Sequence, residues 1–92
     1  MKRIYEDIPV RSVLYVTSPF QPLHIYDFEN EYELSKGTDS EKYKVVYVGT
    51  VGDSSLLPLK IDRAKIRGID IVGGVMRISI CTRKDEYEDY RL

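Results

Sequence analysis

The sequence predicts an α+β domain made mostly of a five-stranded antiparallel sheet, with one short helical segment. Three observations lead to this fold class: a hairpin pattern centred on Gly73-Gly74, several runs rich in β-branched and aromatic residues, and a Pro-containing apolar stretch after Gly52. The strands are expected at residues 10–17, 23–28, 43–51, 65–72 and 75–83. A length of 92 residues fits one domain spanning 1–92, in which residues 85–92 form an acidic tail.

The C-terminal hairpin has the clearest signal, because a Gly-Gly dipeptide can enter the left-handed conformations that a two-residue turn requires. With that turn, apolar residues face apolar residues at four rungs and opposite charges meet at a fifth, each pair contributing about 0.2 to 1 kcal/mol. We expect Ile69 and Ile78 to be buried neighbours. The predicted pairs are Val72 with Val75, Ile71 with Met76, Asp70 with Arg77, Ile69 with Ile78, and Ile66 with Cys81.

The first half of the chain is expected to contribute two strands. Residues 10–17 follow an extended Ile8-Pro9 and carry apolar side chains on both faces, which is typical of a central strand. Residues 23–28 form the second strand after a turn with two prolines. The alternation of residues 29–34 favours a continued strand and a loop at 35–41, although a helix over 29–35 that ends at Gly37 also fits the Glu and Leu content.

The second half begins with a strand at residues 43–51, which Gly49 breaks near its end. A turn then leads into a short helical or irregular segment, LLPLKIDRAK, in which Asp53 or Ser54 could cap exposed N–H groups and whose helix Pro58 limits. Whether the sheet closes into a barrel or packs one face on this segment is left open by the pattern.

Composition excludes several classes of protein. A formal net charge of −1 argues against a general nucleic-acid binder, and a single cysteine excludes an internal disulfide framework. The first ten residues, MKRIYEDIPV, show no signal-peptide apolar region, and no apolar run approaches the roughly 18 to 20 residues that span a membrane. We expect a cytoplasmic protein that makes no membrane contact.

The residues that could support catalysis are few, so we expect no enzyme, no catalytic residue, no metal site and no cofactor. His24 is the only histidine and lies in a predicted strand, which favours a structural role. Cys81 is read as a small buried hydrophobic residue rather than a nucleophile. The Gly and Ser residues near position 52 lack the lysine of a phosphate loop.

Charges are segregated along the chain. Residues 27–41 carry six acids and one base, residues 60–84 carry seven bases and two acids, and residues 85–92 carry four acids and one base. Acidic side chains and tail tyrosines could contact a partner of complementary charge, whereas the basic segment could contact nucleic acid. The expected partner-binding residues are Asp27, Glu29, Glu31, Glu33, Tyr87 and Tyr90. The alternative nucleic-acid-binding residues are Lys60, Arg63, Lys65, Arg67, Arg83 and Lys84.

Two segments, VYVGTVGDSSLLP and IRGIDIVGGVMRISI, resemble small uncharacterised β-rich accessory proteins carried by phages and mobile elements of low-GC bacteria. The resemblance covers less than half the chain and implies no reaction. A compact scaffold without a catalytic set, with abundant Tyr and with separate acidic and basic segments favours binding to a protein partner. We therefore expect an accessory protein of this type, an inhibitor for example of the anti-CRISPR kind, that docks in the host cytoplasm on a larger host protein or protein complex. The alternative is a DNA-binding regulator that uses residues 60–84. An unpaired edge strand would also permit a homodimer.

Overall fold

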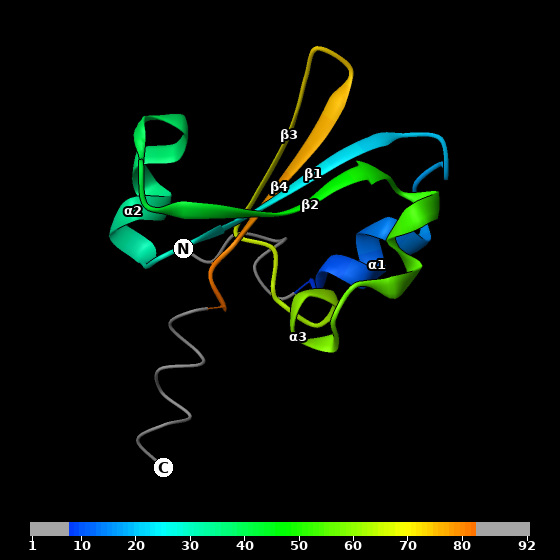
Figure 1. The fold of residues 1–92 in the computed structure, drawn as a ribbon, viewed down its shortest axis with the longest axis horizontal. Helices are drawn as coiled ribbons and strands as arrows, with labels where there is room; N and C mark the ends of the chain where they lie inside the picture. Colours follow the sequence, from blue (N-terminus) through cyan, green and yellow to red (C-terminus); the bar gives the residue numbers. More distant parts are fainter. Residues whose placement is uncertain (1–7, 83–92) are drawn as a thin grey trace.

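The computed structural model describes residues 8–82, which form a four-stranded mixed sheet with short helices (Figure 1). The α+β class is therefore confirmed, whereas the prediction of five antiparallel strands is wrong. The elements are α1 (Val10–Tyr15), β1 (Pro22–Phe28), α2 (Glu31–Lys36), the 3₁₀ helix η1 (Gly37–Asp39), β2 (Tyr43–Thr50), the 3₁₀ helix η2 (Gly52–Leu56), α3 (Leu59–Asp62), β3 (Gly68–Val72) and β4 (Val75–Ile80).

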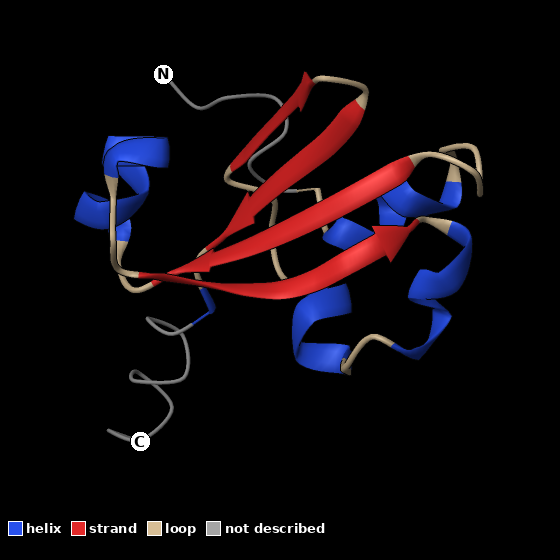
Figure 2. Ribbon diagram, turned by 45° about the horizontal axis from the view of Figure 1, so that its top comes forward, coloured by secondary structure: helices blue, strands red, loops and turns tan. Residues whose placement is uncertain are grey.

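The strands are arranged in the order β2-β1-β4-β3, so β2 and β3 are the edges. β1 pairs antiparallel with β2 but parallel with β4, while β3 and β4 form the C-terminal hairpin. A parallel pair cannot be joined by a tight turn, and the chain makes the crossover through α2, η1, β2, η2, α3 and β3. Figure 2 shows α1 and α3 on one side of the sheet and α2 at one end of it.

The predicted hairpin register is confirmed from Ile69–Ile78 to Val72–Val75, and both turn glycines have positive φ, 59° at Gly73 and 79° at Gly74. The predicted Ile66–Cys81 rung lies outside the ladder because β3 begins only at Gly68. The N–H of Ile66 instead donates to the Ile8 carbonyl at 2.9 Å, so the chain before β3 pairs with the segment that precedes α1.

Residues 10–17 were predicted as a strand, and that prediction is wrong because Val10–Tyr15 is the helix α1. Val10 and Leu14 are buried four residues apart on one helical face, whereas Tyr15 and Val16 are 85% and 83% exposed. Pro9 precedes the helix in an extended conformation. The guanidinium of Arg11 ties α1 to α3 through Asp62, with Nη2 2.7 Å from Oδ1.

The segment after β1 is also helical, so the preferred prediction of a continued strand over residues 29–34 and a loop over 35–41 is wrong. Asn30 caps α2 by accepting the N–H of Glu33 at 2.9 Å, and acidic residues in the first turn complement the helix dipole. Gly37 ends the helix with φ 59°. The alternative reading, a helix that ends at Gly37, is the one that the structure adopts.

The hydrophobic core lies between the sheet and the layer of α1 and α3. Alternate residues of β1 and β4 point into it, as expected for strands with one covered face. Ile78 is fully buried, but its neighbour Ile69 is 40% exposed at the sheet edge, so the prediction that both are buried holds only for Ile78. The buried residues that pack together in this core are Val10, Leu14, Leu23, Ile25, Val51, Ile61, Ile66, Met76, Ile78 and Ile80.

Candidate binding site on the open face of the sheet

The sheet face turned away from α1 and α3, here called the open face, retains several exposed apolar side chains. Strand register assigns residues to this face, since neighbours across a rung point to the same side. Val45, Val48 and Val72 are 49%, 65% and 52% exposed there. The open face carries the side chains of His24, Tyr26, Phe28, Tyr43, Val45, Val48, Asp70, Val72, Val75, Arg77 and Ser79.

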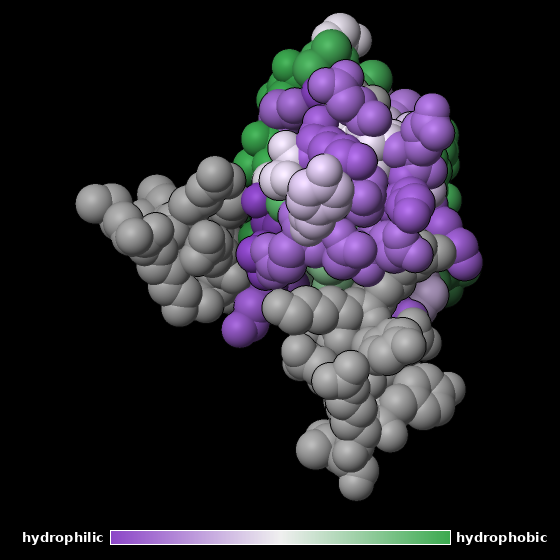
Figure 3. All heavy atoms as spheres, turned by 90° about the vertical axis from the view of Figure 1, so that its left-hand side faces the viewer, coloured by the Kyte–Doolittle hydropathy of each residue, from purple (hydrophilic) through white to green (hydrophobic). Residues whose placement is uncertain are grey.

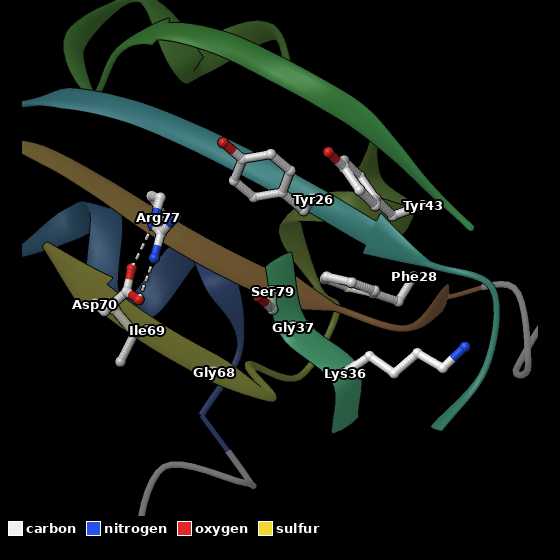
Figure 4. A pocket seen from close by; sticks show the side chains of 10 residues that line it. All are labelled: Tyr26, Phe28, Lys36, Gly37, Tyr43, Gly68, Ile69, Asp70, Arg77 and Ser79. Atoms are coloured by element: carbon white, nitrogen blue, oxygen red, sulfur yellow. Dashed lines mark hydrogen bonds and ion pairs between the residues drawn. The ribbon is translucent and has the colours of Figure 1, made fainter. Parts of the chain in front are cut away.

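A pocket of about 650 Å³ is hollowed into this face where α2 and η1 meet the sheet (Figure 4). Gly68 lies opposite Ser79, and Ser79 lies opposite Tyr26, so two of the smallest side chains separate the sheet edge from a large ring. The hollow follows from this sequence of residue sizes across the sheet. Its lining residues are Tyr26, Phe28, Lys36, Gly37, Tyr43, Gly68, Ile69, Asp70, Arg77 and Ser79.

Three aromatic rings from β1 and β2 form one wall of the pocket. Tyr26 meets Tyr43 in an edge-to-face arrangement, with centroids 5.5 Å apart and planes at 75°, and Phe28 lies 5.4 Å from Tyr43. The hydroxyl of Tyr26 shares a 3.1 Å hydrogen bond with His24 Nδ1. These contacts hold the rings in fixed orientations and support one another across the two strands.

The Asp70–Arg77 ion pair borders the pocket on the side away from the aromatic rings (Figure 4). Arg77 donates from Nε to Oδ1 at 2.8 Å and from Nη2 to Oδ2 at 2.6 Å, a bidentate geometry on the rung that the sequence predicted. The hydrogen bonds from Arg77 hold the pKa of Asp70 below its usual range, and the carboxylate in turn raises the pKa of Arg77.

This pairing predicts a pH effect. Because the pKa of Asp70 is lowered in the folded state, the pair stabilises the fold above the unfolded carboxyl pKa, and that contribution is lost as the pH falls through the folded pKa. Arg77→Gln is expected to raise the pKa of Asp70 toward its ordinary range, because the hydrogen bonds that lower it are lost, as followed by carboxyl NMR titration. The stability change should be small, since the Asp70 side chain is 53% exposed. An unchanged Asp70 titration in this variant would contradict the assigned cause.

Lys36 reaches the pocket from α2 and also has acidic and aromatic neighbours. Its Nζ lies 3.4 Å from Glu33 Oε1 and 4.8 Å from the centre of the Tyr32 ring. A hydrogen bond from Ser40 Oγ and the charge of Lys36 together lower the pKa of the buried Glu33. Figure 3 shows mostly hydrophilic side chains at this end of the molecule. Both pocket cations, Lys36 and Arg77, are thus matched by carboxylates.

The four acids that were expected to form one partner-facing patch do not share a surface. Asp27 is buried and accepts the N–H and hydroxyl of Thr82, while Glu33 is the buried residue of α2 and accepts the hydroxyl of Ser40. Glu31 forms a 2.7 Å ion pair with Arg67, and Glu29 is exposed. The patch was inferred from strand alternation, and the helix α2 removes that alternation.

The basic segment is likewise divided. Arg67 is bound to Glu31, whereas Lys60 and Arg63 belong to α3 and its C-terminal end, on the other side of the sheet from the pocket. Lys65 lies before β3, beside Pro9. Arg83, Lys84, the tail residues Tyr87 and Tyr90, and the whole of 85–92 lie outside the described residues.

The groups considered for catalysis are apart from one another in the structure. Cys81 is buried, as expected, and His24 forms a hydrogen bond with Tyr26 on the open face. Within residues 8–82, no three His, Cys, Asp or Glu side chains gather in a way that could hold a metal ion. In the same part of the chain, every helix is too short or too polar to cross a bilayer.

Sequence reasoning missed the pocket residues Tyr26, Phe28, Tyr43 and Ser79 as a group. The signal was present in the alternation of residues 24–28, where His24, Tyr26 and Phe28 face away from Leu23 and Ile25. Whether this alternation makes a pocket depends on which strand lies beside β1, and that strand is β4, about fifty positions farther along the chain.

Comparison of the chain with protein-family models, curated proteins and solved structures finds no match.

Proposed function

We propose that this chain is a small non-catalytic binding protein that docks on a larger host protein through the open face. The observation that carries the proposal is an aromatic-walled pocket of about 650 Å³ beside exposed valines at positions 45, 48 and 72. Protein interfaces gain most of their affinity from a few side chains in well-packed pockets that a surrounding apolar and polar surface shields from water. The open face has this composition.

The charge arrangement favours a protein partner over a nucleic acid. A nucleic-acid interface gathers cations along one stripe to contact phosphates. Here Arg67 and Arg77 are already bound to carboxylates at 2.7 and 2.6 Å, and Lys60 and Arg63 lie on the helical side of the sheet. With a net charge of −1, the alternative of a DNA-binding regulator using residues 60–84 has less support.

The resemblance to phage-borne accessory proteins supports a bacterial host protein or complex as the partner. An inhibitor of a defence nuclease, comparable to an anti-CRISPR protein, would use a rigid small scaffold of this kind and act in the host cytoplasm. Inhibition would then follow from covering a functional surface of the larger protein, which requires no chemistry from the bound chain.

The proposal predicts that partner capture depends on the open face. The full chain is immobilised and exposed to nuclease-treated host lysate at moderate and high salt, and bound proteins are identified by mass spectrometry. A Val45→Ser, Val48→Ser double variant should reduce recovery of the captured protein about tenfold. It removes two exposed apolar side chains that would contact the partner and that do not line the pocket.

A matched control is Phe20→Ser, which removes an apolar side chain that is 85% exposed in the turn before β1. Equal losses in both variants, or no loss in the double variant, would contradict docking by the open face. Binding that disappears after nuclease treatment and falls steeply with salt would favour the DNA-binding alternative.

A further inference from the structure

We propose that the pocket on the open face is a socket for one aromatic side chain, tryptophan, tyrosine or phenylalanine, contributed by the protein partner. The inference rests on the proposed function and adds the class of group that the pocket receives. Three features carry it: the orientation of the rings, the small residues of the floor, and the balanced charge of the rim.

The ring wall offers an incoming aromatic group the contacts that such groups prefer. Aromatic pairs favour edge-to-face or offset arrangements with centroids 4.5 to 7 Å apart. Tyr26 and Tyr43 stand at 75° to each other, so the wall presents differently oriented ring surfaces. Figure 4 shows the Arg77 side chain across the pocket from these rings, and its planar guanidinium is held by Asp70 in an orientation that can stack on an aromatic face.

The residues that form the pocket floor are small, although the backbone conformation at Gly68 does not require a glycine. Gly68 is not one of the glycines with positive φ, and a Cβ built there would meet Ser79 Cβ at 3.6 Å, which is an ordinary contact. A Cβ at position 68 is therefore compatible with both the conformation and the packing of β3. The Gly68–Ser79 rung keeps open a space that neither turn geometry nor close packing explains.

The rim favours an uncharged ring over a phosphate-bearing nucleotide. Both cations that line the pocket, Lys36 and Arg77, already have carboxylate partners at 3.4 and 2.6 Å. A phosphate would have to compete with Glu33 or Asp70 for them, whereas a neutral aromatic side chain leaves both ion pairs intact. A volume of about 650 Å³ lies within the usual range for ligand sites and admits a large side chain together with parts of its neighbours.

The test titrates isotope-labelled full-length chain with N-acetyl-tryptophanamide, and matched titrations use N-acetyl-leucinamide and thymidine monophosphate. Heteronuclear NMR should show shifts at Tyr26, Tyr43, Gly68 and Ser79, with a dissociation constant of about 1 to 10 mM for so small a probe. The tryptophan probe should bind about three- to tenfold more tightly than the leucine probe, the difference expected for an added aromatic contact.

Ser79→Leu should fill the floor and weaken the tryptophan probe about tenfold. Val75→Leu is the matched control, because Val75 lies on the same strand and face but does not line the pocket. Should Ser79→Leu fail to fold, Gly68→Val narrows the same floor from the edge strand, and its folding is checked by its thermal transition.

Three results would overturn the socket: equal binding of the leucine probe, stronger pocket shifts with thymidine monophosphate, or tryptophan binding that survives both floor variants. Failure here is distinguishable from failure of the proposed function. Partner capture that depends on Val45 and Val48 but is unaffected by Ser79→Leu would support docking by the open face and contradict only the aromatic socket.

Discussion

Replacing Ile78 by alanine is expected to lower the free energy of unfolding by about 2 to 4 kcal/mol, a large part of the stability of a small domain. Ile78 is fully buried, and it lies between Ile25 of β1 and Ile69 of β3 in the centre of the sheet. Truncation would remove apolar contacts and leave a cavity that the neighbouring strands cannot fully close. Urea denaturation, with the slope of the transition fitted separately, measures the effect.

Ile69→Ala is the matched control, since the same side chain is shortened on the facing rung. Its 40% exposure predicts a loss of about 1 kcal/mol or less, because part of the side chain already contacts water. Equal losses at the two positions, or an unchanged denaturation midpoint for Ile78→Ala, would contradict the placement of the core between the sheet and α1.

Replacing Asp27 by alanine is expected to cost about 2 to 3 kcal/mol, the second large effect. The carboxylate is 4% exposed, and it accepts the N–H of Thr82 at 2.9 Å and the Thr82 hydroxyl. Its removal would leave a buried N–H without an acceptor just after β4, so the cost comes mainly from an unsatisfied donor. Thermal and urea denaturation of the variant test this expectation.

Two controls separate the contributions of Asp27. Asp27→Asn keeps an oxygen that can accept the Thr82 N–H and should cost less than Asp27→Ala. Thr82→Val removes only the hydroxyl and leaves the backbone donor paired, so its effect should also be smaller. If Asp27→Ala were as stable as the parent chain, the carboxylate would not anchor the end of β4.

Local chemistry was enough to predict the hairpin. The turn depends on two adjacent glycines that can adopt positive φ, and the register then follows from residue spacing alone. The Asp70–Arg77 pair on the open face is a direct consequence of that register. The strands β1 and β2 were also recognised, since their β-branched and aromatic content is high and their ends are close to those predicted.

Residues 10–17 show why local pattern failed at the first element. Apolar residues at positions 10, 13, 14 and 16 fit a strand buried on both faces as well as a short amphipathic helix. The helix is stabilised by contacts distant in sequence, namely burial of Val10 and Leu14 against the sheet and the Arg11–Asp62 ion pair. A six-residue helix has little stability of its own, so packing decides between the two readings.

The acidic stretch shows the same limit for function. Alternation suggested one exposed patch, yet Asp27 binds Thr82, fifty-five positions away, and Glu31 binds Arg67, thirty-six positions away. Nothing near either acid in the sequence identifies these partners. Asp27 and Glu31, which were candidate binding residues, therefore have structural roles that depend on tertiary contacts.

By itself, the amino-acid sequence determined the α+β class, the hairpin with its register, and a helical segment after β2, because each depends on residues within a few positions of one another. The expected cap by Asp53 or Ser54 is wrong, since the N-cap residues of η2 and α3 are Val51 and Pro58, without a side-chain cap. Only the tertiary structure decided that β1 lies parallel to β4, which face of the sheet α1 and α3 cover, and which face stays open. The pocket draws on α2, η1 and all four strands. Its floor and walls become neighbours only when the crossover places Tyr26 beside Ser79, since side-chain contact across a sheet depends on strand order and not on distance along the chain.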